Sequence, residues 1–187
     1  MAEHRLKPLS PLGRPDPEAT AIGAFRIAER TDVALGSLAA RAGREAEVEA
    51  LAEGAGIPLP GPGRAAGREV WAAFWLSPAQ WMVEAPFATH EDIVAHLKPI
   101  FGDAASITEQ TDAWVRFDVT GPLQSLFERL CNLDIARMEP GAATRTLIEH
   151  VGVHMVRRAP DATSVLGPRS SAASLHHALL TAARSVS

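Results

Sequence analysis

Cysteine is almost absent from this chain, tyrosine is absent altogether, and no block of basic charge stands out. One cysteine in 187 residues excludes an internal disulfide and suits a reducing compartment, so we expect a cytoplasmic protein. The net charge is −4, whereas a nucleic-acid-binding surface needs a positive patch, so we expect no nucleic-acid partner. No apolar run approaches the ~18 residues of a membrane span, and residues 1–15 lack a secretory apolar core. We therefore expect no membrane association.

The usual catalytic and nucleotide-binding motifs are missing as well. There is no G-x-S-x-G, no G-x-G-x-x-G that opens a helix after a strand, and no Gly-Lys-Ser/Thr ending in the Gly/Pro-rich loop 57–68. His150 and His154 are four residues apart, but along a strand this spacing separates them by ~13 Å, and no third ligand is near. Cys131 falls in an apolar stripe, which favours a buried thiol over a nucleophile. The sequence predicts no catalytic, cofactor-binding or metal-binding residue.

What the chain does contain is ordinary for a folded protein. Hydrophobic residues make up 47% and charged residues 21%, and this length can bury a substantial core. Residues 1–20 carry four prolines and are predicted to form an extended arm, either a disordered tail or a strap that orders on a partner. Residues 21–187 are predicted to form a single domain.

The stretch 118–135 is the strongest structural signal. Its apolar residues follow helical spacing after a Gly-Pro corner, with Pro122 expected as the first helical residue and Asn132 as a left-handed stop. Residues 114–119 alternate as a strand does. A strand followed by a strongly amphipathic helix resembles half of a βαβ unit. The helix is expected to lie on a sheet, because its apolar face has to be buried against another element.

Patterns in the rest of the first half predict further elements. We expect strands at 25–34, 35–39 and 106–110, with breaks at Thr31–Asp32 and Gly36, and a hairpin formed by 69–77 and 80–85. We expect a helix at 44–53 and another capped by Thr89 with Asp92 as a capping box.

The second half is expected to read β-α-β-β-α. Residues 143–157 form one extended run with a possible break at Gly152, residues 164–166 return after a turn, and a final helix begins at 169–171. On this helix the neighbours His176 and His177 point about 100° apart, so one of the two is expected to pack at the helix edge and the other to meet solvent. Together the patterns predict an α+β protein with a mostly antiparallel sheet and helices packed on it.

Three residues are candidates for contact with a partner. Trp81 belongs to a group of four tryptophans that are expected to be mostly core, but a tryptophan at a sheet rim anchors interfaces well. Arg145 and Arg169 flank apolar strands, where an arginine is either a solvated strand end or a fork that binds a carboxylate.

Four segments, in this order, resemble the gamma subunit of bacterial heterotetrameric sarcosine oxidase. The likeness runs from about Ile22 to the C-terminus, departing at Ser171 and around Ala162, and its segments are WLSPAQWMVEAP, VTGPLQSLFERLCNLDI, ATRTLIEHVGVHMVRR and PRSSAASLHHALLTAA. The resemblance implies a fold like the folate-binding domain of the glycine-cleavage T-protein. It also implies alpha, beta and delta partner subunits.

The resemblance implies a function as well. Such assemblies oxidise sarcosine to glycine with tetrahydrofolate and oxygen, giving 5,10-methylenetetrahydrofolate and hydrogen peroxide. FAD, FMN, NAD and zinc are expected in the partner subunits and none in this chain, which would be a non-catalytic structural subunit. The alternative is a stand-alone folate-binding regulatory protein of the T-protein superfamily, with Glu84, Asp118 and Glu149 as the acids near strands.

Overall fold

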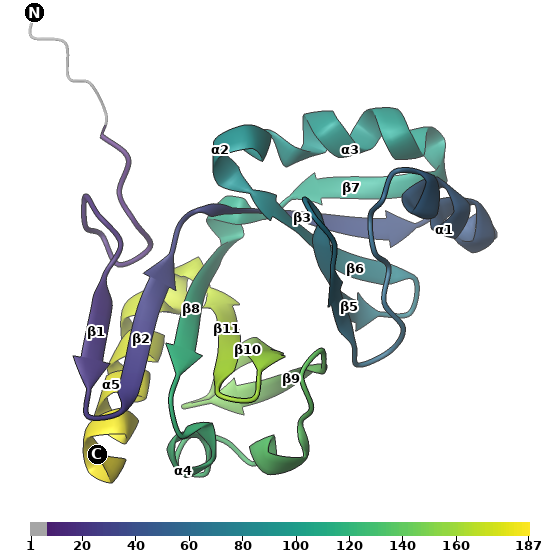
Figure 1. Ribbon diagram of the computed structural model, residues 1–187. Helices are drawn as coiled ribbons and strands as arrows, with labels where there is room; N and C mark the ends of the chain where they lie inside the picture. The colour runs from purple at the N-terminus through teal and green to yellow at the C-terminus, as the bar shows by residue number, and fades with distance from the viewer. Residues whose placement is uncertain (1–6) are drawn as a thin grey trace, which may run out of the picture.

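Two antiparallel sheets organise the molecule, which a computed structural model describes from residue 7 to residue 187 (Figure 1). The six-stranded sheet has the order β1 (Ala19–Ile22), β2 (Phe25–Arg30), β8 (Trp114–Thr120), β11 (Ala162–Pro168), β10 (Val151–Ala159) and β9 (Ala143–Ile148). The five-stranded sheet has the order β4 (Ala65–Gly67), β5 (Ala72–Ser77), β6 (Gln80–Pro86), β3 (Val33–Ala40) and β7 (Ala105–Glu109). The α+β class is confirmed, with two sheets in place of the expected one.

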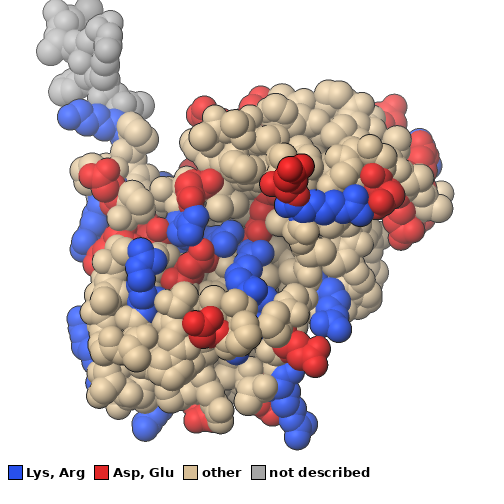
Figure 2. All heavy atoms as spheres, in the orientation of Figure 1, with Lys and Arg blue, Asp and Glu red and all other residues tan. Residues whose placement is uncertain are grey.

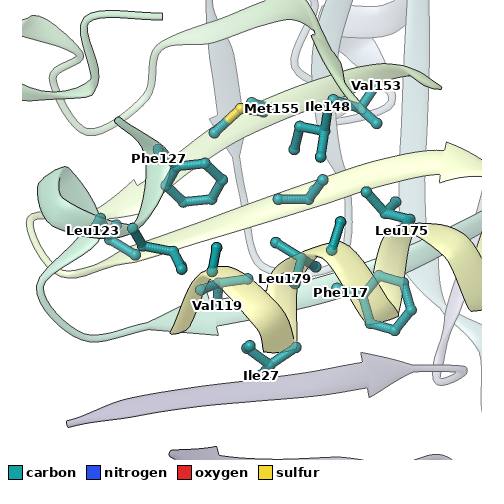
Figure 3. Packing of buried hydrophobic residues seen from close by; sticks show 14 of the residues in the cluster. Ile27, Phe117, Val119, Leu123, Phe127, Ile148, Val153, Met155, Leu175 and Leu179 are labelled. Atoms are coloured by element: carbon teal, nitrogen blue, oxygen red, sulfur yellow. The ribbon is translucent and has the colours of Figure 1, made fainter. Parts of the chain in front are cut away.

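Helices cover the outer face of each sheet. Packing α4 (Leu123–Phe127) and α5 (Ala172–Val186) on the six-stranded sheet builds the largest core cluster, around Phe117 and Phe127 (Figure 3). On the five-stranded sheet, α1 (Glu45–Gly54) and α3 (Ile93–Phe101) build a second cluster. The shorter helices are α2 (Phe87–His90), η1 (Gly102–Ala104), η2 (Thr111–Ala113), η3 (Ile135–Arg137) and η4 (Arg169–Ser171).

The inner faces of the two sheets meet in a third, smaller cluster. Leu35, Phe74 and Met82 come from the five-stranded sheet and pack on Val156 and Leu166 of the six-stranded sheet. Because side chains alternate along a strand, one face of β5 packs on the helices and the other face packs on the six-stranded sheet. The layers therefore run helices, sheet, sheet, helices.

The predicted helix after the Gly-Pro corner is shorter than its stripe. Regular α4 ends at Phe127, and the chain continues in tighter turns in which Leu130 N–H bonds the Phe127 carbonyl at 3.1 Å. Leu130 and Cys131 still pack on the core, so the stripe is buried as expected. Pro122 is the N-cap rather than the first helical residue, and Asn132 does not have the predicted left-handed backbone.

The βαβ interpretation was wrong. Strand β8 pairs antiparallel with β2 and β11, and after α4 the chain crosses to β9 at the far edge of the same sheet. The expected run at 143–157 is two strands, β9 and β10, joined by a turn at Glu149–His150 with φ of 47° and 71°. The second half therefore has one strand more than predicted, and the break lies at this turn rather than at Gly152.

Two local predictions in the first half also needed correction. The capping box was wrong, because Asp92 is itself the N-cap of α3 and its carboxylate accepts the Ala95 N–H at 2.9 Å. Strand β3 does not break at Gly36, which stays paired with both neighbouring strands, β6 and β7. The glycine makes room for α3, since a Cβ there would lie 3.3 Å from both Ile93 and Leu97. The helix at 44–53, the hairpin of β5 and β6, and the break at Thr31–Asp32 are confirmed.

Candidate functional site

Charged side chains join the two sheets beside their apolar contact. We call this group the seam network; it consists of Glu84 on β6 and Arg116, Asp118, Arg158 and Ser164 on the six-stranded sheet. The side chain of Glu84 is only 5% exposed and that of Arg116 13%. Charged atoms of both signs lie along the line between the two halves of the molecule in Figure 2. Buried charges of this kind persist only where each one is paired.

Each member of the seam network has a partner at hydrogen-bonding distance. Both carboxylate oxygens of Glu84 accept from Arg158 Nη2, at 2.7 and 2.9 Å. Arg116 Nε donates to Asp118 Oδ1 at 2.8 Å, and its Nη1 lies 3.5 Å from Glu84. The Ser164 hydroxyl accepts from Arg158 Nε at 2.9 Å and donates to Asp118 at 2.7 Å. The network therefore links strands from both sheets without a gap.

These pairings hold Asp118 and Arg116 in their charged forms. Burial alone would raise the pKa of Asp118, but the charge of Arg116 and the hydrogen bonds from Arg116 and Ser164 hold it below its ordinary value. Burial would lower the pKa of Arg116, yet Glu84 and Asp118 raise it. Groups held charged in this way do not exchange protons near neutral pH, and Ser164 is fully buried. The network joins the two sheets through paired charges.

A cavity of about 890 Å³ lies next to the seam network. One wall is residues 8–17, and the opposite walls come from β3, α2, η2 and the start of β8. Its volume is in the range of about 300–1,000 Å³ that small-molecule sites occupy. Arg30 and Arg116 reach its lining, but both are already paired with carboxylates.

The part of the arm that the structure describes lies against the domain. The buried carboxylate of Glu29 accepts the backbone N–H of Leu12 at 2.9 Å and that of Glu18 at 3.1 Å. Arg169 Nη2 donates to the Leu9 carbonyl at 3.0 Å. The predicted arm boundary at residue 20 falls inside β1, and residues 1–6 of the arm lie outside the described residues. An arm that orders on a partner stays a prediction.

The three predicted contact residues lie far apart in the fold. Trp81 is 6% exposed in the core under α1 and α3, and its indole N–H donates to the Pro60 carbonyl at 2.8 Å. Arg145 is exposed on the edge strand β9, where its guanidinium packs over Gly152. Arg169 pairs with Asp112 at 3.2 Å beside the cavity, so it is the one of the three that reaches a site. Contact with a partner stays a prediction for all three.

One histidine of the pair on α5 packs and the other is exposed, as predicted, and the structure shows which. His176 is buried and stacks on Phe117, with ring centroids 5.3 Å apart, and His177 is exposed. His150 lies in the turn before β10, apart from His154 on the strand. Between residues 7 and 187, no group of three or more His, Cys, Asp or Glu side chains is arranged to hold a metal.

Acid should destabilise the fold through His154. Its ring lies between Phe74 and Trp114, with centroids 5.7 and 5.2 Å away, and burial with the charge of Arg145 lowers its pKa to about 4. The unfolded chain, with an ordinary histidine pKa near ~6.5, binds this proton first, so stability is full above that pH and is lost as pH falls toward 4. Denaturant unfolding across this range should show a loss of about 2 kcal/mol. His154→Phe should flatten the profile, and an unchanged slope would contradict this assignment.

Sequence reasoning did not find the seam network. Glu84 and Asp118 were named only as acids near strands, and neither was connected with an arginine; Glu84 and Arg158 lie 74 residues apart. The sequence signal that could have found the network was the presence of charged residues inside otherwise apolar strands in both halves of the chain.

No helix in the described part of the chain has the length and apolar character needed to cross a bilayer.

Comparisons with known proteins identify the fold. No model of a protein family matches the sequence, and no curated protein matches it significantly. A chain of heterotetrameric sarcosine oxidase from Corynebacterium sp. U-96, solved with pyrrole 2-carboxylate, superposes with a TM-score of 0.75 over 89% of this chain and 87% of that one, at 21% identity. Aminomethyltransferase T of the glycine cleavage system from Bartonella henselae matches at a TM-score of 0.59 and 16% identity over 83% of this chain.

These likenesses establish a T-protein-like fold, as the sequence resemblance predicted. This chain spans about half of the aminomethyltransferase, since 48% of that protein is covered. The sarcosine oxidase chain is matched over nearly its whole length, and the similar coverage of both chains means that they have nearly the same length.

Proposed function

We propose that this chain is the non-catalytic gamma subunit of a heterotetrameric sarcosine oxidase, with a structural and assembly role. The observation that supports this most is the match along nearly the full length of a chain from such an oxidase, with 89% and 87% coverage and a TM-score of 0.75. The order of the four resembling sequence segments gives independent support.

On this proposal the chemistry belongs to the assembly. Sarcosine is demethylated to glycine with tetrahydrofolate and oxygen, giving 5,10-methylenetetrahydrofolate and hydrogen peroxide, in the cytoplasm. FAD, FMN, NAD and zinc would lie in the alpha, beta and delta chains. The seam network supports a scaffold role for this chain, because its buried charges pair with one another and hold the two sheets in one arrangement.

Deletion of this chain from its host tests the proposal. We expect the remaining chains to lose stable association, and sarcosine-dependent oxygen consumption in extracts to fall by about tenfold or more, because a buttressing subunit orders its neighbours. Re-expression of the full chain should restore both. A stable oxidase with full activity in the deleted strain would contradict the proposal.

A stand-alone folate-binding regulatory protein is the second candidate, and the cavity of about 890 Å³ is the observation that favours it. The acids expected to bind folate do not reach it freely, since Glu84 and Asp118 are paired with arginines and Glu149 lies in an exposed turn. Calorimetry of the isolated chain with tetrahydrofolate separates the two functions. Micromolar binding would favour the regulatory protein.

A further inference from the structure

We propose that the cavity beside the arm is a docking groove for an extended segment of a partner subunit, one that inserts an apolar side chain and carries Lys or Arg beside it. This inference rests on the proposed function and deepens it, because it names the surface that meets the partner and the chemistry of the segment that binds. We call this surface the arm groove. It comprises the cavity walls and the exposed acidic residues on its rim.

The walls of the arm groove are apolar on two sides. Val33, Leu35, Phe87 and Trp114 line the domain side. The arm side is made by Leu9 and by prolines at positions 8, 11, 15 and 17. Leu9 is 52% exposed at the edge, one of the few large apolar side chains so exposed in residues 7–187. Aromatic-lined grooves take up extended segments, and burying apolar side chains there removes apolar surface from water.

The rim gives the arm groove a negative field. Arg30 and Arg116 at its base are neutralised by carboxylates that lie outside the lining or deep in the seam network. Among the described residues that line the cavity, Arg169 is the cation left to offset the carboxylates of the rim, all four of which are exposed: Glu91, Asp92, Glu109 and Asp112. A rim of this sign attracts basic residues and repels an anionic ligand, so charge complementarity favours a basic segment.

The arm that forms one wall of the groove is already held in place. Arg169 bonds the Leu9 carbonyl at 3.0 Å and Asp112 at 3.2 Å, and Glu29 accepts two backbone N–H groups from the arm. A groove whose walls are fixed before binding saves the partner the cost of ordering the arm. Arg169, predicted from sequence as a contact residue, thus acts by positioning the wall.

Charge reversal on the rim tests the arm groove in the intact assembly. The full chain is tagged, expressed in its native host in place of the wild type, and recovered at low salt. Glu91→Lys combined with Glu109→Lys should recover about tenfold less of the partner chains. The loss should shrink at high salt, where surface charges are screened beyond ~3 Å at 1 M. Zero-length carbodiimide crosslinking of the wild-type complex should join Glu91 or Glu109 to a partner lysine beside an apolar residue.

A matched control makes the same change of charge on the surface of the protein away from the arm groove. Glu49→Lys combined with Glu69→Lys alters two exposed carboxylates that do not line the cavity, and it should recover partner chains at the wild-type level. The neutral pair Glu91→Gln and Glu109→Gln should give an intermediate loss, and thermal unfolding verifies that each variant is folded.

The outcomes separate this inference from the proposed function. Wild-type recovery by the rim variant, or crosslinks only to other surfaces, overturns the arm groove and leaves the subunit role standing. A rim variant that changes only tetrahydrofolate binding identifies a small-molecule occupant and also overturns it. A wild-type chain that recovers no partner chains overturns both.

Discussion

Glu84→Gln is expected to lower the free energy of unfolding by about 3–5 kcal/mol, because removing one member of a buried ion pair leaves the other charge uncompensated. Arg158 donates to both oxygens of this carboxylate, and Arg116 lies 3.5 Å from it. The amide of glutamine keeps the size of the side chain but neither its charge nor its second acceptor. Chemical denaturation at neutral pH measures the loss.

An exposed ion pair provides the control for this variant. Arg68 also pairs with a glutamate at 2.7 Å, but the side chain of that partner, Glu53, is 71% exposed. Glu53→Gln should therefore cost less than about 1 kcal/mol. Equal effects of the two substitutions would contradict the view that the seam network holds the sheets together.

Phe127→Ala is the second substitution with a large expected effect. Phe127 is fully buried where α4 packs on the six-stranded sheet, among Leu123, Val119 and Met155 (Figure 3). Truncating a buried phenylalanine to alanine costs about 3–5 kcal/mol, through lost transfer energy and the cavity left behind. Thermal or urea unfolding measures the change.

Leu147→Ala is the matched comparison, since this large apolar side chain on β9 is 60% exposed. Its truncation should change stability by less than about 0.5 kcal/mol. A small effect at Phe127 would mean that the helix and its sheet do not share the core cluster described above.

Local patterns in the sequence were enough for most elements and for the fold class. The stripe at Leu123, Leu126 and Phe127 predicted burial correctly even though regular helix ends early, because tighter turns kept the same side facing the core. Errors came where the backbone itself decides the outcome. The turn at Glu149–His150 has positive φ at two consecutive residues that are not glycine, and the sequence lacks the Asn-Gly or Asp-Gly pair that usually indicates such a turn.

The candidate site could not be predicted in the same way. The seam network joins Glu84 to Arg158 across 74 residues, and a single sequence holds no information on which charges meet over such a distance. The arm groove depends on the Glu29 carboxylate, which accepts the backbone N–H groups of Leu12 and Glu18. Every residue except proline carries such an N–H group, so the residue types do not show which ones the carboxylate will bind. Arg169 was identified from its place at a strand end, but its partners were not.

On the proposed function, this chain acts through contact with other chains. Native mass spectrometry of the tagged full chain, purified from its own host without crosslinking, tests that contact most directly. We expect one copy of the chain in a particle with three other polypeptides, with flavin absorbance in the same fraction. A 19.9 kDa monomer, or a homo-oligomer without flavin, would contradict the account.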